Sequence, residues 1–162
     1  MKYYKPGDVP MVKGDKLSLD LCSKNDLEKD FIKDVSYPSS VGSLIYAQVC
    51  TCLDIAFIVN ALESYQTNPG RIHWVASKKV MRYLKKTRDY MLMYKRVDDL
   101  EVIGYTDSDF AGCPDDLRST SGFIFMFVWG EISWKSVKQT LKASFTMQAE
   151  FVACYDAATQ AI

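Results

Sequence analysis

The sequence predicts an α+β protein in which helices come first and a small sheet followed by one further helix comes second. Three observations lead to this prediction. Apolar residues recur at helical spacing in the first part of the chain, they alternate at strand spacing from about residue 100, and helical spacing returns after about residue 145. With 162 residues, of which 48% are apolar, the chain can form one substantial core or two small ones.

Residues 1–37 are predicted to form an extended polar arm. Proline and glycine interrupt this stretch repeatedly, at Pro6, Gly7, Pro10 and Gly14. A polar segment of this kind cannot bury enough apolar surface to fold alone.

Residues 38–98 are predicted to form a helical hairpin with one basic face. Ser39 and Ser40 can cap a helix, and helical spacing then continues to about residue 66, as one long helix or as two helices that meet near Thr51. Pro69 and Gly70 end this segment. The next helix is predicted from apolar residues four positions apart, namely Ile72, Ala76, Val80 and Leu84.

Charge is distributed unevenly although the formal net charge is zero. Residues 71–96 contain nine Lys and Arg residues against one acidic residue, Asp89. Four basic residues of the predicted helix lie off its apolar stripe, namely Lys78, Arg82, Lys85 and Lys86. Together with Lys79 they are the candidate nucleic-acid-binding residues. A polyanion such as a nucleic acid could dock on this face, and an ordinary solvated helix face is the alternative interpretation.

Residues 99–162 are predicted to form a β-β-β-α unit. Strand-like runs at 90–96 and 100–108 flank a turn at 97–99, and runs at 122–128 and 131–137 flank a second turn at Trp129 and Gly130. The last segment has helical spacing, with Thr146 as its possible cap. Its predicted buried side contains Met147, Phe151, either Cys154 or Tyr155, and Ala158.

Two carboxylates suggest metal chemistry. Asp107 is expected where the first strand of this unit ends, and Glu150 lies on the following helix. Carboxylate oxygens suit Mg²⁺, and two such ions about 3.5–4 Å apart can hydrolyse a phosphodiester. The alternative for Glu150 is an ordinary exposed position on a helix flank, and Asp109 is better explained as a turn former. Two carboxylates alone rarely hold a pair of ions.

Other functional classes receive little support. The five cysteines form no CxxC pair and His73 is the only histidine, so a zinc site is not expected and the thiols are expected to be reduced. No phosphate-binding glycine loop or GxSxG motif occurs. The chain has no apolar run of 18 residues and no apolar core of a secretory signal within its first thirty. We therefore expect a soluble, intracellular protein, cytoplasmic or nuclear, that makes no contact with membranes.

Several long motifs occur in an order that resembles the Pol polyprotein of copia-type plant retrotransposons. The motifs include YPSSVGSLIYAQVCTCLDIAFIVNALESYQTNPGRIHWVASKKVMRYLKKTRDYMLMYKR, LEVIGYTDSDFAGC, STSGFIFMF, ISWKSVKQT and MQAEFVAC. The resemblance covers the stretch that joins reverse transcriptase to ribonuclease H. It implies a ribonuclease H-like fold from about residue 99, with Asp107 and Glu150 as the Mg²⁺ ligands, and upstream helices that grip a nucleic acid duplex.

The sequence also departs from that family. Cys52 and Leu53 stand where the family usually has a basic residue and a proline, and Gln148 replaces an acidic residue. The later acids of the family lie beyond Ile162. We therefore expect an incomplete, catalytically inactive remnant of an enzyme that hydrolysed RNA in RNA–DNA hybrids, with weak Mg²⁺ binding or none.

An alternative function is a non-catalytic fragment that binds nucleic acid or protein through residues 71–96. We also expect that a partly uncovered sheet face allows self-association.

Overall fold

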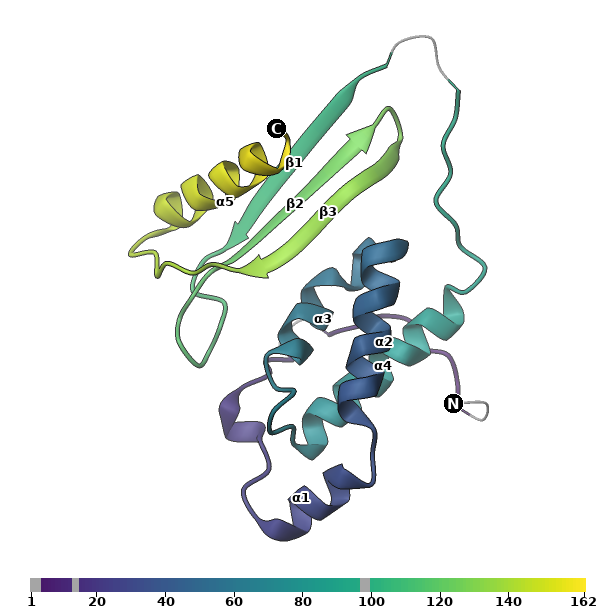
Figure 1. Ribbon diagram of the computed structural model, residues 1–162, viewed down its shortest axis with the longest axis vertical. Helices are drawn as coiled ribbons and strands as arrows, with labels where there is room; N and C mark the ends of the chain where they lie inside the picture. Colours follow the sequence, from purple (N-terminus) through teal and green to yellow (C-terminus); the bar gives the residue numbers. More distant parts are fainter. Residues whose placement is uncertain (1–3, 13–14, 97–99) are drawn as a thin grey trace. The chain divides into compact units, whose positions relative to one another are not determined.

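The computed structural model describes residues 4–12, 15–96 and 100–162 (Figure 1). The chain divides into two compact units, Met1–Tyr90 and Met91–Ile162. The boundary and the turn expected at 97–99 lie outside the described residues.

The first unit is helical. Its described residues form α1 (Asp26–Lys33), α2 (Tyr37–Cys50), α3 (Ala56–Glu63) and α4 (Arg71–Lys86), with short 3-10 helices η1 (Leu19–Leu21) and η2 (Leu53–Ile55). Of the two arrangements that the sequence left open, two helices meeting near Thr51 is right, because α2 ends at Cys50 and α3 begins at Ala56. Helix α2 begins at Tyr37 with Pro38 in its first turn, two residues before the expected start at Ser39.

Helix α1 corrects the prediction that residues 1–37 are extended throughout. The Asn25 side chain accepts a hydrogen bond from the Glu28 backbone amide at 2.8 Å, and Glu28 accepts one from the Lys24 amide at 2.8 Å. These contacts satisfy amides at the helix start that would otherwise have no partner. Local capping therefore supports a helix in a stretch whose composition alone favours an extended chain.

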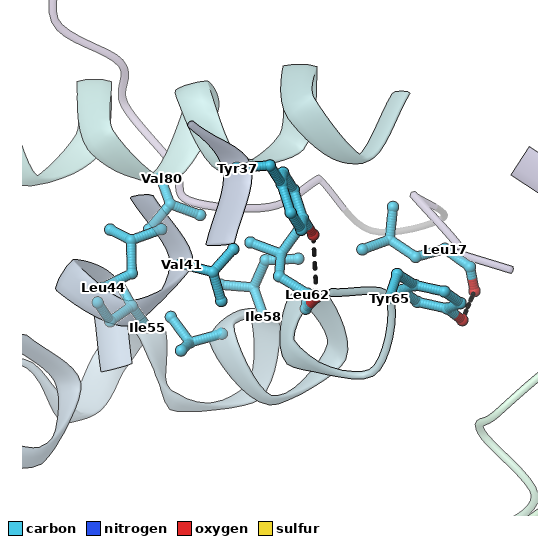
Figure 2. Close-up of a cluster of buried hydrophobic side chains, with 10 residues drawn as sticks. Leu17, Tyr37, Val41, Leu44, Ile55, Ile58, Leu62, Tyr65 and Val80 are labelled. Carbon is cyan, nitrogen blue, oxygen red and sulfur yellow. Dashed lines mark hydrogen bonds between the residues drawn. The ribbon is translucent and has the colours of Figure 1, made fainter. Parts of the chain in front are cut away.

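The core of the first unit joins α2, α3, α4 and the end of the arm (Figure 2). Tyr37 is fully buried and its hydroxyl donates to the Leu62 carbonyl at 2.9 Å, while burial raises the pKa of this hydroxyl. The Tyr65 hydroxyl donates to the Leu17 carbonyl at 3.0 Å. Leu17 is itself buried. The arm is thus anchored to the core at Leu17.

Helix α4 turns a partly different face inward from the one predicted. Its buried residues are His73, Ser77 and Val80, whereas Ile72 is 51% exposed. The His73 ring packs on Tyr65 with 4.3 Å between ring centroids, and its Nδ1 accepts a hydrogen bond from the Gly70 amide at 3.0 Å. A polar side chain with two specific contacts therefore occupies a core position that the apolar pattern assigned to its neighbour.

The second unit confirms the α+β class and the predicted order of three strands and a helix. Strands β1 (Val102–Asp109), β2 (Thr120–Phe127) and β3 (Gly130–Lys138) form an antiparallel sheet in the order β1-β2-β3, and α5 (Thr146–Gln160) follows. Helix α5 packs on β1 and β2 (Figure 1).

The strand predicted at 90–96 is wrong. These residues form no strand, and within the described part of the chain β1 pairs with β2. The segment contacts the β2–β3 hairpin through a side chain instead, since the Tyr94 hydroxyl donates to the Glu131 carbonyl at 2.6 Å. Met91 and Met93 are more than three-quarters exposed. The segment therefore lacks the half-buried face that a paired strand requires.

The predicted buried side of α5 is also wrong. The residues that face the sheet are Ala149, Ala153 and Ala157, whereas Met147, Phe151 and Tyr155 are 73%, 71% and 65% exposed. Small side chains let a helix approach a sheet closely, so the alanine stripe rather than the large apolar one lies against β1 and β2. Thr146 is the first helical residue and not the cap.

Candidate metal centre and nucleic-acid interface

Asp107 lies on β1 opposite Gly122 of β2. Its side chain is exposed, and its Oδ1 accepts a hydrogen bond from the Ser108 backbone amide at 2.8 Å. The strand does not end at Asp107 as expected but continues to Asp109, which pairs with Thr120. Because strand side chains alternate, Asp107 and Asp109 share one face of the sheet.

Asp109 lies at the start of a turn. Its backbone carbonyl accepts a hydrogen bond from the Gly112 amide at 3.4 Å. Its carboxylate lies against Gly112 so closely that a Cβ atom added there would be 1.9 Å from Oδ2. This position agrees with the interpretation of Asp109 as a turn residue.

Glu150 is positioned by a buried glutamine that the sequence analysis missed. Gln139 is 2% exposed, and its Nε2 donates to the Ser121 hydroxyl at 2.8 Å and to the Ala149 carbonyl at 2.9 Å. These two bonds join the first turn of α5, directly before half-buried Glu150, to the start of β2. In the sequence, the one signal for Gln139 is that a polar residue directly follows a predicted strand, and this signal is too common to identify a buried residue.

The two predicted metal ligands lie on elements that contact each other, Asp107 on β1 and Glu150 on α5. The Asp107 side chain, however, is on the face of the sheet opposite α5. Ser121 lies under α5 through Gln139, and its register partner Ser108 shares that face. Asp107, one residue away, is therefore on the opposite face. β1, which carries Asp107, is an edge strand of this sheet.

Within the described residues, the structure gives no larger group of ligands around Asp107 and Glu150. Among the residues that the structure describes, no group of three or more His, Cys, Asp or Glu side chains is placed to hold a metal ion. Mg²⁺ needs near-octahedral oxygen coordination, and two carboxylates supply a small part of it.

The predicted basic residues do gather on one face of α4, and the N-terminal arm crosses that face. Lys79 Nζ lies 2.7 Å from Asp15 Oδ2, and Lys86 Nζ lies 2.5 Å from Asp8 Oδ1. Two backbone carbonyls of the arm accept further bonds, from Arg82 Nε to Lys5 at 2.7 Å and from Lys85 Nζ to Tyr4 at 2.9 Å.

The remaining contacts complete this picture. The Gly7 backbone amide donates to the Arg82 carbonyl at 3.0 Å, and Lys78 Nζ lies 5.5 Å from the centroid of the Trp74 ring. Four of the five predicted cations, Lys79, Arg82, Lys85 and Lys86, therefore contact the arm.

Both ion pairs shift the pKa values of their carboxyl groups. The hydrogen bond from Lys79 holds the pKa of Asp15 below its usual value, and the hydrogen bond from Lys86 does the same for Asp8. The side chains of both pairs remain about 40% exposed or more. Exposed pairs contribute little to stability, so these contacts can exchange with other anions.

Within the described part of the chain, no helix is both long and apolar enough to cross a bilayer. All five cysteines are free thiols.

The structure defines an α+β protein that carries one carboxylate on a strand, one on a helix, and a basic helix. Comparison with known proteins shows which proteins it resembles. The chain is 40% identical over its full length to the "Retrovirus-related Pol polyprotein from transposon TNT 1-94" of Nicotiana tabacum. It is 35% identical over 91% of its length to the "Retrovirus-related Pol polyprotein from transposon RE2" of Arabidopsis thaliana.

A third relative is much shorter. The chain is 37% identical over 81% of its length to "Secreted RxLR effector protein 161" of Plasmopara viticola and covers 92% of that protein. By contrast, it spans 12% and 10% of the two Pol polyproteins. No protein-family profile matches the chain. No solved structure matches it either.

The chain belongs to the retrovirus-related Pol polyproteins of copia-type transposons.

Proposed function

We propose that the chain derives from the part of Pol in which the reverse transcriptase is joined to ribonuclease H. In this proposal the second unit corresponds to the first strands and first helix of a ribonuclease H-like domain, and Asp107 and Glu150 are its ancestral Mg²⁺ ligands. The order β1-β2-β3-α5, together with the contact between α5 and the strand that carries Asp107, supports the assignment.

The proposal includes the absence of useful cleavage by this chain. Losing transition-state charge stabilisation by metal ions costs several kcal/mol, which corresponds to several orders of magnitude in rate. The donor set described above is incomplete, so we derive no cleavage step. Incubation of the purified chain with a labelled RNA–DNA hybrid and Mg²⁺ should give no product. Cleavage that disappears in Asp107→Asn would overturn this proposal.

The function that the geometry supports best is binding of a nucleic acid duplex, with the RNA–DNA hybrid as the ancestral ligand. The observation that carries it is the row of cations on α4. Lys78, Lys79, Arg82, Lys85 and Lys86 occupy successive turns of one helix, and the eight steps from Lys78 to Lys86 cover about 12 Å along the helix axis. Such a row can follow a phosphate backbone and read its charge and shape without reading bases.

Lys78 and Lys85 provide the test of this proposal, because both belong to the row of cations on α4 and lie seven residues apart on the same face of the helix. The double variant Lys78→Gln/Lys85→Gln should bind a fluorescent RNA–DNA hybrid about tenfold more weakly than the wild type at low salt, since two phosphate contacts are lost. The matched control is Lys29→Gln/Lys33→Gln on α1, which removes the same charge from another helix. If both variants lose the same affinity for the hybrid, binding depends on the overall charge of the protein and not on the basic face of α4.

We also propose an intracellular location and self-association of the chain. An intracellular location is supported by the five free thiols. Self-association is supported by the sheet face opposite α5, where Ile103 and Tyr105 are 36% and 56% exposed. Sedimentation velocity over a range of concentrations tests the second, because Ile103→Thr/Tyr105→Thr should lower the fraction of dimer if this face is responsible.

A further inference from the structure

The N-terminal arm presents to α4 the same kind of groups that a phosphate backbone would present. Asp8 and Asp15 place carboxylate oxygens on Lys86 and Lys79, and the Tyr4 and Lys5 carbonyls accept from Lys85 and Arg82. All four contacts are oxygen acceptors aligned along one helix face. The arm therefore occupies the surface to which the duplex-binding function is assigned.

We propose that the arm, residues 4–12 together with Asp15, is an intramolecular competitor that covers the basic face of α4 and leaves it when a nucleic acid duplex binds. This inference rests on the proposed duplex binding and adds its regulation. A duplex and the arm cannot both use Lys79 and Lys86, so the affinity measured for the full chain is lowered by the cost of displacing the arm.

The structure gives the arm a firm anchor and a weakly held remainder. Its anchor is Leu17, which is buried and accepts a hydrogen bond from Tyr65. Before this anchor, one described backbone hydrogen bond joins the arm to α4, from the Gly7 amide to the Arg82 carbonyl. A cavity of about 280 Å³ also lies between the arm and the helices, lined by residues that include Pro10, Met11, Ile58 and Ala76.

These features allow the arm to detach without unfolding the core. Exposed ion pairs are individually weak, and both ion pairs of the arm are exposed. The buried residues of the core cluster all lie outside residues 4–12, and Met11 of the arm packs against the cluster as a partly buried neighbour.

The test is the double variant Asp8→Asn/Asp15→Asn in the full chain. It keeps the size of both side chains but removes both ion pairs, so Lys79 and Lys86 become available. We expect a labelled RNA–DNA hybrid to bind roughly tenfold more tightly than to the wild type, the range expected for removing two exposed ion pairs. Asp26→Asn/Asp30→Asn on α1 changes the net charge equally and should change the affinity less than twofold. Circular dichroism establishes that each variant is folded.

Hydrogen exchange of the Gly7 amide provides a second readout. Adding the hybrid to the wild type should accelerate exchange at Gly7, because its acceptor on Arg82 is lost when the arm leaves. Tighter binding by the arm variant together with faster exchange supports the inference. A gain no larger than that of the α1 variant, with unchanged exchange at Gly7 while the wild type binds, overturns the inference and leaves duplex binding intact. Absence of binding by the wild type and by the arm variant overturns both.

Discussion

At the scale of single residues, the molecule depends on a few buried polar side chains with specific partners. Gln139 is the clearest, since it links β3 to β2 and to the first turn of α5. Tyr37 and His73 do the same within the helical unit. Each satisfies backbone or hydroxyl groups that would be costly to bury alone.

Replacing Gln139 should destabilise the second unit. Gln139→Ala leaves the buried Ser121 hydroxyl and the Ala149 carbonyl without this donor, so we expect the free energy of unfolding to fall by about 2 kcal/mol. Urea denaturation followed by circular dichroism measures it. Gln160→Ala, at the exposed end of α5, is the control and should change stability by less than about 0.5 kcal/mol. Similar losses in both variants would contradict the linking role of Gln139.

Replacing Tyr37 tests the core of the first unit. Tyr37→Phe keeps the ring but leaves the buried Leu62 carbonyl without its donor, so the free energy of unfolding should fall by about 1 kcal/mol. Tyr90→Phe removes a hydroxyl from a residue that is 80% exposed and should have almost no effect. An unchanged stability of Tyr37→Phe would show that this hydrogen bond adds nothing beyond the burial of the ring.

At the scale of elements, the side of α5 that faces the sheet determines where Glu150 lies. Ala153 is 1% exposed and lies between Ala149 and Ala157, whereas Phe151 points away from the sheet. Ala153→Leu should destabilise the second unit by about 1–3 kcal/mol because the helix has no room for a larger side chain. Phe151→Ser should cost less than about 0.5 kcal/mol and lower aggregation. Urea denaturation of both variants gives the comparison, and a larger loss in Phe151→Ser would reverse our orientation of α5.

The sequence predicted the type and order of most elements but not which faces they bury. Periodicity identified α2, α3, α4, the sheet and α5, because each has enough apolar residues at regular spacing. It failed at α5 since large apolar residues and small ones lie on opposite sides of that helix, and the small ones pack. It failed at α4 because His73 is buried through specific contacts. The arm's contacts with α4 depend on residues more than 60 positions apart, which no local pattern encodes.

The arm should also respond to pH. Lys86 and Lys79 lower the pKa values of Asp8 and Asp15 when the arm is bound. The two ion pairs therefore stabilise the bound arm fully at pH values above the usual carboxyl pKa of 3.8. This stabilisation is lost as the pH falls through the lowered pKa values of Asp8 and Asp15. The NMR signal of the Gly7 amide should therefore stay unchanged between neutral pH and about pH 5 and shift below pH 3.8. In Asp8→Asn/Asp15→Asn the acid-dependent shift should be absent, and its persistence would assign the transition to other groups.

At the scale of the whole molecule, the two units carry opposite charge. Residues 1–90 contain 14 Lys and Arg against 10 Asp and Glu, and residues 91–162 contain 6 against 10, so the units carry +4 and −4. The formal net charge of zero is therefore the sum of a basic helical unit and an acidic unit, and the acidic unit contains Asp107 and Glu150. If the chain binds a duplex as proposed, we expect the charge of the first unit to attract the duplex and the charge of the second unit to repel it.

The salt dependence of hybrid binding tests this account most directly. We expect the logarithm of the association constant of the full chain to fall linearly with the logarithm of salt concentration, with a slope that becomes smaller by about 2 in Lys78→Gln/Lys85→Gln, since each lost phosphate contact removes about one unit. The Lys29→Gln/Lys33→Gln control should keep the slope of the wild type. Binding that does not depend on salt, or a slope that is the same in all three proteins, would contradict the assignment of nucleic acid binding to the basic face of α4.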